Sequence, residues 1–542
     1  ANASNSGVYG KMYQMLSAYN PMTGQFLLPN TPEAKAAYLH DAEYRNTNWF
    51  SELFSNNIMH NHSVSVTAGT EKAQLYASLS AMLDPGWSLR SNVQRYTLNL
   101  NASFSLSKKL QLGLIGNGSY RKQTAPGTLS SGTDPVSGEV SRDFDINPYS
   151  YAVNTSRTLD AHTFYTRSYA PFNILHELGN NYMDLNVADF RAQAKLSYKP
   201  ITKVDLSVLG AVKYTGTSRE HYITESSNQA QAYRAMYTSV IRNNNPYLYK
   251  DPEHLFDLPM SVLPYGGMYH RTDNRMFGWD FRASASYNDV IAKDHIINTY
   301  LGMETNSYTR HSSWFQGYGM QYEMGEEANW AYQMFKKKQE DGGSYYGLGN
   351  TNTRSAAFFA NATYSWKGRY TVNGTLRYEG TNGLGLSRQS RWLPTWNVSA
   401  AWNAHEEPWF EKKVGKVMSH FTFKASYSLT ADRPPVTNAL AIIKSITPWR
   451  YFTGNSETGL YRSNPANPDL TYEKKHELNL GVDIGFLKNR INLSVDWYKR
   501  NNYDLIGPAT TQGIGGQVTK YGNIATMKSN GIELSLSTVN IK

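Results

Sequence analysis

Two histidines, His60 and His62, stand two residues apart in an asparagine-rich segment of the 542-residue chain. On a strand, residues two apart face the same side, so the two imidazoles could bind a transition metal or belong to a nuclease-like site. Such sites need several convergent ligands, and no cysteine, third histidine or acidic cluster accompanies this pair in the sequence. We therefore expect no metal site here.

Asp143, Asp145 and Asn147 repeat the oxygen ligands that open a calcium-binding loop. The position that requires glycine holds Pro148, and the position of the bidentate glutamate holds Asn154, so the EF-hand geometry fails. We expect no cofactor, and a looser calcium site stays open as an alternative.

The glycine-rich segment GGSYYGLGN at 342–350 lacks the lysine and the serine or threonine of a phosphate-binding loop. The chain also shows no nucleophile elbow and no clear set of nucleophile, base and orienting residue. We expect no catalytic residues and no enzymatic activity. A triad scattered over several loops remains the alternative.

Aromatic side chains are the strongest candidates for ligand recognition, because flat rings stack on sugar faces at little conformational cost. Many of them lie in long polar segments, where Asn, Arg, Asp and Glu neighbours could orient hydroxyl or peptide groups. The alternative is that the rings only pack these segments together or against a partner. The candidate substrate-binding residues are Trp314, Phe315, Tyr318, Tyr322, Trp330, Arg377, Glu379, Trp449 and Tyr451.

We expect strands to position these residues. Polar and apolar residues alternate from Arg95 to Ser107 and in many other segments. A period of two indicates strands with one apolar and one polar face. Each predicted strand is long enough for the roughly nine to eleven tilted residues that cross a bilayer. The predicted strands are 60–69, 72–83, 94–107, 109–121, 188–199, 202–214, 276–290, 294–311, 354–366, 369–380, 392–403, 418–430, 473–486, 490–502, 518–527 and 530–540.

Tight and long connections alternate between these strands. The tight ones lie near Lys108, Pro200, Gly368 and Asn489, and the long ones at 122–187, 215–275, 312–353 and 431–472. In bacterial outer-membrane barrels, tight turns face the periplasm and long loops face outside, so the strand at 94–107 descends and the strand at 109–121 rises. We assign residues 1–59 to a first strand, within 1–15, and the first extracellular loop, and residues 1–542 to a single barrel domain.

The composition agrees with an all-β, transmembrane antiparallel β-barrel. The chain is 40% hydrophobic with a mean hydropathy of −0.55, as expected when only alternate residues of the spans touch lipid. No run of about 18 apolar residues occurs, which excludes transmembrane helices. Cysteine is absent, which excludes disulfides and thiolate chemistry. The net charge of +10 is spread along the chain, so nucleic-acid binding is not needed to explain it.

The polar face of the predicted strands carries charges of both signs, including Asp189, Arg191, Arg377 and Glu379. Charges at such depth require water or ion pairing, which predicts a wide hydrated lumen. A soluble β-sandwich or propeller lectin is the alternative fold. Strands of ten to fourteen residues and loops of about sixty residues disfavour it.

Six segments together point to one protein family. They are HNHSVSVTAGTEKAQLYASLS at 60–80, RYTVNGTLRYEGTNGLG at 369–385, RWLPTWNVSAAW at 391–402, FKASYSLTADR at 423–433, NPDLTYEKKHELNLGVDIGFLKNRINLSVDWYKR at 467–500 and NGIELSLS at 530–537. These segments resemble the SusC/RagA family of TonB-dependent outer-membrane transporters of Bacteroidetes. Ala68, Glu379 and Tyr472 depart from the family pattern, where glycine, aspartate and tryptophan are common. The resemblance implies a barrel of about 22 strands, of which about 16–17 lie in this chain, with the plug, the TonB box and the terminal strands absent from it.

The resemblance also implies a function and partners. It predicts a multi-pass outer-membrane protein that imports oligosaccharides with a SusD-like surface lipoprotein, driven by TonB acting on a plug. It further implies a dimer of such pairs embedded in outer-membrane lipid, with no nucleic-acid partner. Oligopeptide import by the same class of transporter is the main alternative, and a passive porin, a soluble lectin and a surface enzyme are the others.

Overall fold

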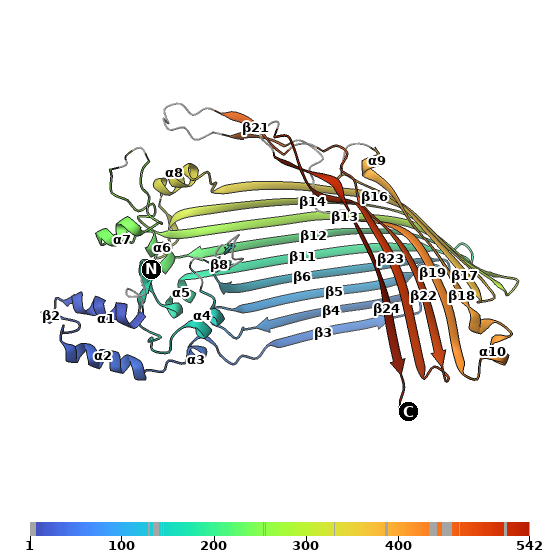
Figure 1. Cartoon of the computed structure of the whole chain (residues 1–542), viewed down its shortest axis with the longest axis horizontal. Helices are drawn as coiled ribbons and strands as arrows, with labels where there is room; N and C mark the ends of the chain where they lie inside the picture. Colours follow the sequence, from blue (N-terminus) through green and yellow to red (C-terminus); the bar gives the residue numbers. More distant parts are fainter. Residues whose placement is uncertain are drawn as a thin grey trace.

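One antiparallel sheet of sixteen strands dominates the structure, a computed structural model. In this sheet every long strand pairs with the long strands before and after it in the sequence, and the short strand β15 pairs only with β14. Figure 1 shows these strands side by side in a strongly curved sheet. The structure describes residues 7–127, 131–133, 140–142, 144, 146–252, 254, 256–329, 331–384, 388–432, 442–446, 458–464, 467–513 and 518–540.

The long strands match the alternation seen in the sequence, and most of them extend further. β3, β18 and β22 have the predicted bounds, whereas β13 and β14, with 25 and 27 residues, are more than twice as long as the roughly nine to eleven residues that a bilayer crossing requires. The long strands are β3 (His60–Gly69), β4 (Ala73–Asp84), β5 (Asn92–Ser105), β6 (Leu110–Pro126), β11 (Asn181–Tyr198), β12 (Val204–Ile223), β13 (Gly267–Ile291), β14 (His295–Gln321), β16 (Tyr346–Trp366), β17 (Tyr370–Thr381), β18 (Trp392–Asn403), β19 (Met418–Asp432), β22 (Glu473–Phe486), β23 (Ile491–Thr510) and β24 (Thr519–Thr538).

The prediction of two strands at 518–527 and 530–540 is wrong, because both segments belong to the single strand β24. Asn530 and Gly531 stay in register with Lys499 and Tyr498 of β23 and form no turn. An added Cβ at Gly531 would lie 2.6 Å from the hydroxyl of Tyr498, so the glycine leaves room for this ring on the strand surface.

The prediction of a rising strand within residues 1–15 is also wrong for the described part of that segment. Gly7–Ser17 form helix α1, in which Val8 and Met12 are buried one turn apart. This four-residue spacing puts both side chains on one helix face, which packs against the other segments outside the sheet.

The two faces of the sheet differ in polarity. On β12, Val208, Val212 and Tyr214 point to one side and are exposed to the surroundings. On the other side, Lys213 of β12 lies 3.7 Å from Asp189 of β11, and Lys424 of β19 lies 2.6 Å from Asp483 of β22. An exposed apolar face suits lipid, and the ion-paired face suits a hydrated interior.

Connections at one end of the sheet are short, apart from residues 404–417 between β18 and β19. Residues 367–369 join β16 to β17, and Lys367 and Gly368 in this tight turn both have positive φ. At the other end, residues 127–180, 224–266, 322–345 and 433–472 form long connections, which we place outside the cell. Because most strands are longer than predicted, the first three of these loops begin later and end earlier than expected, and residues 312–321 belong to β14 and not to a loop.

The long connections at the β6–β14 side carry small folded units of their own, seen at the left of Figure 1. Their helices enclose apolar clusters, one of which joins Trp49 and Leu53 to Ile146, Phe172 and Ile174. None of the described helices is long and apolar enough to cross a bilayer. The helices are α1 (Gly7–Ser17), α2 (Pro32–Tyr44), α3 (Trp49–Leu53), α4 (Pro148–Asn154), α5 (Ile174–Asn180), α6 (Asn228–Ala232), α7 (Ser239–Asn244), α8 (Tyr332–Glu340), α9 (Arg388–Arg391), α10 (Phe410–Lys413) and the 3-10 helix η2 (Ala404–Glu406).

Short strands complete these units and the remaining connections. They are β1 (Tyr19–Asn20), β2 (Gln25–Phe26), β7 (Ser131–Thr133), β8 (Val140–Arg142), β9 (Tyr165–Arg167), β10 (Ala170–Phe172), β15 (Glu327–Ala328), β20 (Ile442–Ile446) and β21 (Gly459–Asn464). Apart from β15, they pair with one another in two-stranded sheets outside the main sheet.

The polarity of the two faces predicts opposite effects for neighbouring positions of β5. Leu100 is 40% exposed on the apolar face, and Asn101 is exposed on the other face. We expect Leu100→Arg to lower the free energy of unfolding by about 2–4 kcal/mol, because it places a charge in hydrocarbon, and Asn101→Arg to change it by less than about 1 kcal/mol. Urea unfolding of the native protein refolded into lipid vesicles measures both values. Equal losses would contradict the assignment of the faces.

Candidate functional site

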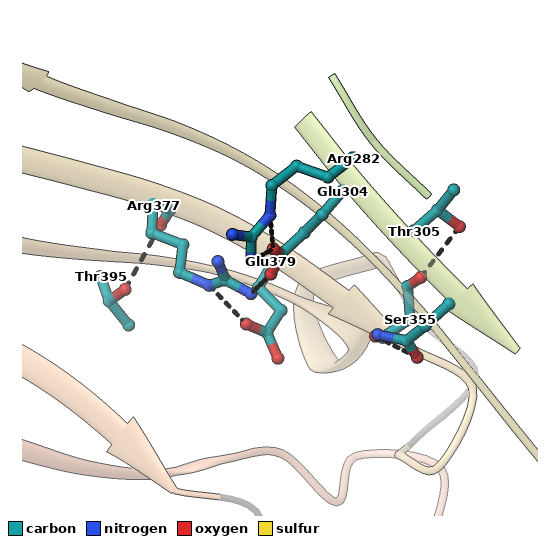
Figure 2. Close-up of polar contacts among 8 residues, drawn as sticks. Arg282, Glu304, Thr305, Ser355, Arg377, Glu379 and Thr395 are labelled. Atoms are coloured by element: carbon teal, nitrogen blue, oxygen red, sulfur yellow. Dashed lines mark hydrogen bonds and ion pairs between the residues drawn. The ribbon is translucent and has the colours of Figure 1, made fainter. Parts of the chain in front are cut away.

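An ion-pair network lies on the hydrated face of the sheet, where β13, β14 and β17 contribute its members (Figure 2). The carboxylate of Glu304 on β14 accepts from Arg282 at 2.6 Å and from Arg377 of β17, also at 2.6 Å. Arg377 additionally donates to Glu379 at 2.6 Å. The two arginines and two glutamates balance each other's charge, so the network stabilises this wall without creating a charged site.

Arg377 reaches Glu304 across the intervening strand β16. The Arg282 guanidinium lies 5.9 Å from the ring of Phe359, which β16 presents on the same face. Hydrogen bonds from Thr305 to the Ser355 carbonyl oxygen, at 3.1 Å, and from Thr395 to the Arg377 carbonyl oxygen, at 3.4 Å, flank the network in Figure 2. The structure therefore brings together the predicted residues Arg377 and Glu379, near the outer end of β17.

A cavity of about 770 Å³ opens on the same face at the outer ends of β11–β14. Side chains from these strands form its walls, and Lys338 of α8 and Gln229 of α6 reach it from the loops. Strand register sets Arg219, Thr272 and Trp314 opposite one another on β12, β13 and β14. The walls combine cationic, amide and aromatic groups, which can bind a polar ligand that also has an apolar face.

The predicted aromatic residues Trp314 and Tyr318 line this cavity. Trp314 is 37% exposed, and its indole lies over Gly347 of β16, where an added Cβ would clash with the ring. Tyr318 is only 9% exposed, and its hydroxyl donates to Gln316 at 3.0 Å. The exposed indole is thus free to meet a ligand, whereas the tyrosine mainly supports the wall.

The predicted residue Phe315 also lies at the rim of the cavity, although strand alternation directs its side chain to the other face of β14, where it is 45% exposed. Tyr322 lies outside the cavity lining. Its hydroxyl donates to the Met268 carbonyl oxygen at 2.7 Å and its ring meets Tyr222 edge-on, so it packs a loop onto the sheet. Trp330, Trp449 and Tyr451 lie outside the described residues.

Sequence reasoning missed the polar residues of the cavity, among them Arg219, His221, His270 and Lys338. Alternation continued past Tyr214 would have found Arg219 and His221, which share a face of β12. Lys338 comes from helix α8, which folds back over the strands, and the sequence pattern does not predict that return.

The two cavity histidines are neutral at physiological pH. Burial, together with smaller effects of the nearby Lys338 and Arg219, lowers the pKa of His270 to about 4. Burial likewise lowers the pKa of His221 to about 3, with smaller effects of His270 and Arg219. The imidazole of His221 donates from Nε2 to Asn181 Oδ1 at 2.6 Å, which fixes its orientation.

Metal-binding candidates do not assemble into a site in the part of the chain that the structure describes. No group of three or more His, Asp or Glu side chains there could hold an ion. His60 and His62 do share a side of β3, with ring centroids 6.1 Å apart. Asn147 is engaged as the N-cap of α4, and Asp143 and Asp145 lie outside the described residues.

The loops around the cavity are tied to each other through a buried carboxyl group. Glu177 of α5 accepts a hydrogen bond from the backbone N–H of Asn228, the first residue of α6, at 2.6 Å. The Asn228 side chain donates to the carbonyl oxygens of Arg167, Ala170 and Pro171. Burial raises the pKa of Glu177 to about 7, although the Asn228 hydrogen bond and Arg167 oppose this effect.

Comparison with known proteins finds similarity to TonB-dependent receptors. The family model described as "TonB dependent receptor-like, beta-barrel" matches residues 213–539. TonB-dependent receptor P26 of Formosa agariphila is 21% identical over 514 residues, which cover 92% of this chain and 45% of that protein. TonB-dependent receptor SusC of Bacteroides thetaiotaomicron is 26% identical over 202 residues, covering 34% of this chain and 19% of that protein.

Among solved structures, the RagAB peptide transporter matches with a TM-score of 0.67 at 17% identity, covering 98% of this chain and 54% of that chain. The likeness at this identity concerns the fold. The chain spans about half the length of the relatives that it matches along most of its own length.

The ion-pair network predicts energetic coupling between β14 and β17. We expect the double-mutant cycle of Arg377→Gln and Glu304→Gln to give a coupling energy of about 1 kcal/mol, because both groups are only partly shielded from water. Unfolding of the four native-protein variants in urea measures it. A coupling energy near zero would show that this contact contributes nothing to stability.

The raised pKa of Glu177 predicts that the attachment of α5 to α6 weakens as pH rises. Its pKa is higher in the folded protein than the ordinary value of 4.5, so its contribution is complete below pH 4.5 and is lost as pH rises through about 7. The loss amounts to about 3 kcal/mol. Hydrogen exchange of residues 224–232, corrected for intrinsic rates, should show weaker protection at pH 8.5 than at pH 5. Glu177→Gln should remove this difference, and an unchanged pH dependence in that variant would contradict the assignment.

Proposed function

Because the chain belongs to the family of TonB-dependent receptor-like β-barrels and is an outer-membrane protein of SusC/RagA type, we propose that it imports oligosaccharides across the outer membrane. The TonB-dependent transporters of this family are not enzymes. A hydrated, ion-paired wall inside an apolar exterior supports passage of a polar solute through the barrel.

The observation that carries the choice of cargo is the exposed indole of Trp314 in the outer cavity. It lies on the same strand face as Gln316 and next to Thr272 of β13. A flat ring flanked by amide and hydroxyl groups suits the apolar face and the hydroxyls of a sugar ring. The cavity also lies at the outer end of the sheet, where a cargo arriving from outside first meets the wall.

The proposal includes partners. We assign capture of the cargo to a SusD-like surface lipoprotein, energy to TonB acting through a plug, and the assembled state to a dimer of transporter–lipoprotein pairs. The loops support such an assembly, since α3–α6 form folded units joined by Glu177 and Asn228 and thus provide a firm outer surface.

Oligopeptide import is the second candidate. It is favoured by the likeness to RagAB, a peptide transporter with the same fold. A peptide backbone would form hydrogen bonds with the amide and hydroxyl groups of the cavity and would not depend on stacking against the indole. A passive porin is the remaining alternative, and it would conduct ions steadily in a planar bilayer.

Cargo binding can be measured by isothermal titration of the native protein, purified from outer membranes with any lipoprotein that co-purifies, against panels of oligosaccharides and oligopeptides. We expect oligosaccharides to bind, and Trp314→Ala to weaken binding about tenfold because the stacking surface is lost. Trp279→Ala is the matched control, since this indole is 40% exposed opposite Val212 on the apolar face and does not line the cavity. Binding of peptides alone would overturn the choice of oligosaccharide.

A second measurement separates import from passive diffusion. Uptake of the bound cargo by intact cells should stop when TonB is deleted or the membrane potential is dissipated. Uptake that continues unchanged under both conditions would overturn the proposal of active import.

A further inference from the structure

Five cationic side chains on the hydrated face near its outer end have no carboxylate partner among the residues that the structure describes. They are Arg95 of β5, Arg121 of β6, Arg219 of β12, Arg310 of β14 and Lys338 of α8. Deeper on the same face, several cations are paired: Arg282 and Arg377 with Glu304, and Lys424 with Asp483. Among the described residues, unpaired cations are thus gathered at the outer end.

Two of these cations, Arg219 and Lys338, line the outer cavity, and no Asp or Glu is among the described residues that line it. Their present hydrogen bonds go to neutral groups: Arg219 donates to Thr272 at 3.5 Å, and Lys338 donates to Gln316 at 3.1 Å. Neutral partners leave both charges available to an incoming anion.

The acidic residues nearest in sequence do not neutralise the cavity. Glu220 and Asp273 alternate with Arg219 and Thr272, so they point to the opposite face of the sheet. There both are engaged by Arg271, at 3.0 and 2.7 Å. Arg271, which also lies at the rim of the cavity, is therefore paired with carboxylates, whereas Arg219 and Lys338 contact none among the described residues.

His270 adds an unsatisfied polar atom to the same wall. Its Nε2 is buried and has no hydrogen-bond partner among the described residues, although buried polar atoms in proteins normally have one. The residue lies between His221 of β12 and Gln316 of β14 and lines the cavity. A ligand oxygen that entered the cavity could supply the missing partner.

From this arrangement we propose that the outer cavity is a subsite for a carboxylate group of the cargo. Arg219 and Lys338 bind the carboxylate, His270 contributes a hydrogen bond through Nε2, and the attached ring or apolar group packs against Trp314. Arg219 and Trp314 lie two strand spacings apart, about 10 Å, a span suited to a carboxylate and the ring that carries it. This inference rests on the proposed import function and assigns acidic cargo to it.

The test compares charged and neutral forms of two cargo types. The first pair is a galacturonate tetrasaccharide and its carboxyl-reduced neutral form, and the second is an acidic tetrapeptide and its fully amidated form. Isothermal titration of the native protein should show that the charged member of a binding pair binds at least about tenfold more tightly than the neutral member. This preference should decrease as sodium chloride is raised.

Arg219→Gln should remove the preference for the charged member. Arg275→Gln is the matched control, because Arg275 is an exposed residue opposite Gly216 on the outward face of the neighbouring strand β13. It removes the same charge from the protein without touching the cavity, so the preference should persist. The abundance of each variant in the outer membrane checks that the barrel has assembled.

Three results would overturn the carboxylate subsite. They are equal affinity for charged and neutral members, equal effects of Arg219→Gln and Arg275→Gln, and absence of binding by both charged probes. None of these results would by itself contradict the proposed import function, because TonB-dependent uptake of a neutral oligosaccharide would still support that function. Whichever pair binds shows whether the carboxylate belongs to a sugar or to a peptide.

Discussion

Backbone hydrogen bonding between neighbouring strands is the constraint on which the rest of this structure depends. Hydrocarbon offers no partner for an N–H or C=O group, so each spanning segment must satisfy its backbone on the strands beside it. Antiparallel pairing from β3 to β24, interrupted by bulges only in the pairs β13–β14, β19–β22 and β23–β24 among the described strands, does so between the two edges of the sheet. Once this register is set, the side-chain period of two assigns every residue to lipid or to the interior.

Charged side chains on the interior face are arranged in two different ways. Around Glu304, cations and carboxylates are matched, which keeps charged groups stable on a partly shielded wall. Near the outer end, Arg219 and Lys338 contact only neutral groups, and the same face presents an exposed indole. Ion pairs therefore stabilise the middle of the wall, and the proposed recognition site lies where strands continue towards the long loops.

Much of the sheet could be predicted from sequence because alternation is a local property. Failures occurred where local signals conflict with strand register. Asn530–Gly531 is a typical turn pair, yet pairing with β23 keeps it extended, and the glycine accommodates the ring of Tyr498. Residues 312–321 are polar enough to suggest a loop, but β14 continues through them because β13 and β16 extend alongside.

The candidate site was predictable only in part, for the same reason. Trp314 and Phe315 are adjacent aromatic residues, and only the register shows that Trp314 lies on the hydrated face beside Thr272, whereas Phe315 reaches the cavity rim from the other face. The ion pair between Arg377 and Glu379 follows from their spacing on one strand face, whereas the contact with Glu304 spans a further strand. Lys338 lines the cavity because helix α8 folds back over the strands, and no local sequence pattern predicts this path of the chain.

Labelling of single cysteines along β12 tests the central claim, an apolar exterior around a hydrated interior, most directly. These 542 residues contain no cysteine, so each cysteine substitution from residue 206 to residue 213 introduces the single thiol of this part of the protein, and the unsubstituted protein gives the background labelling. In intact outer membranes, a small charged thiol reagent should modify positions 207, 209, 211 and 213 and spare 206, 208, 210 and 212. Modification of both sets alike, or of the even positions alone, would contradict this account.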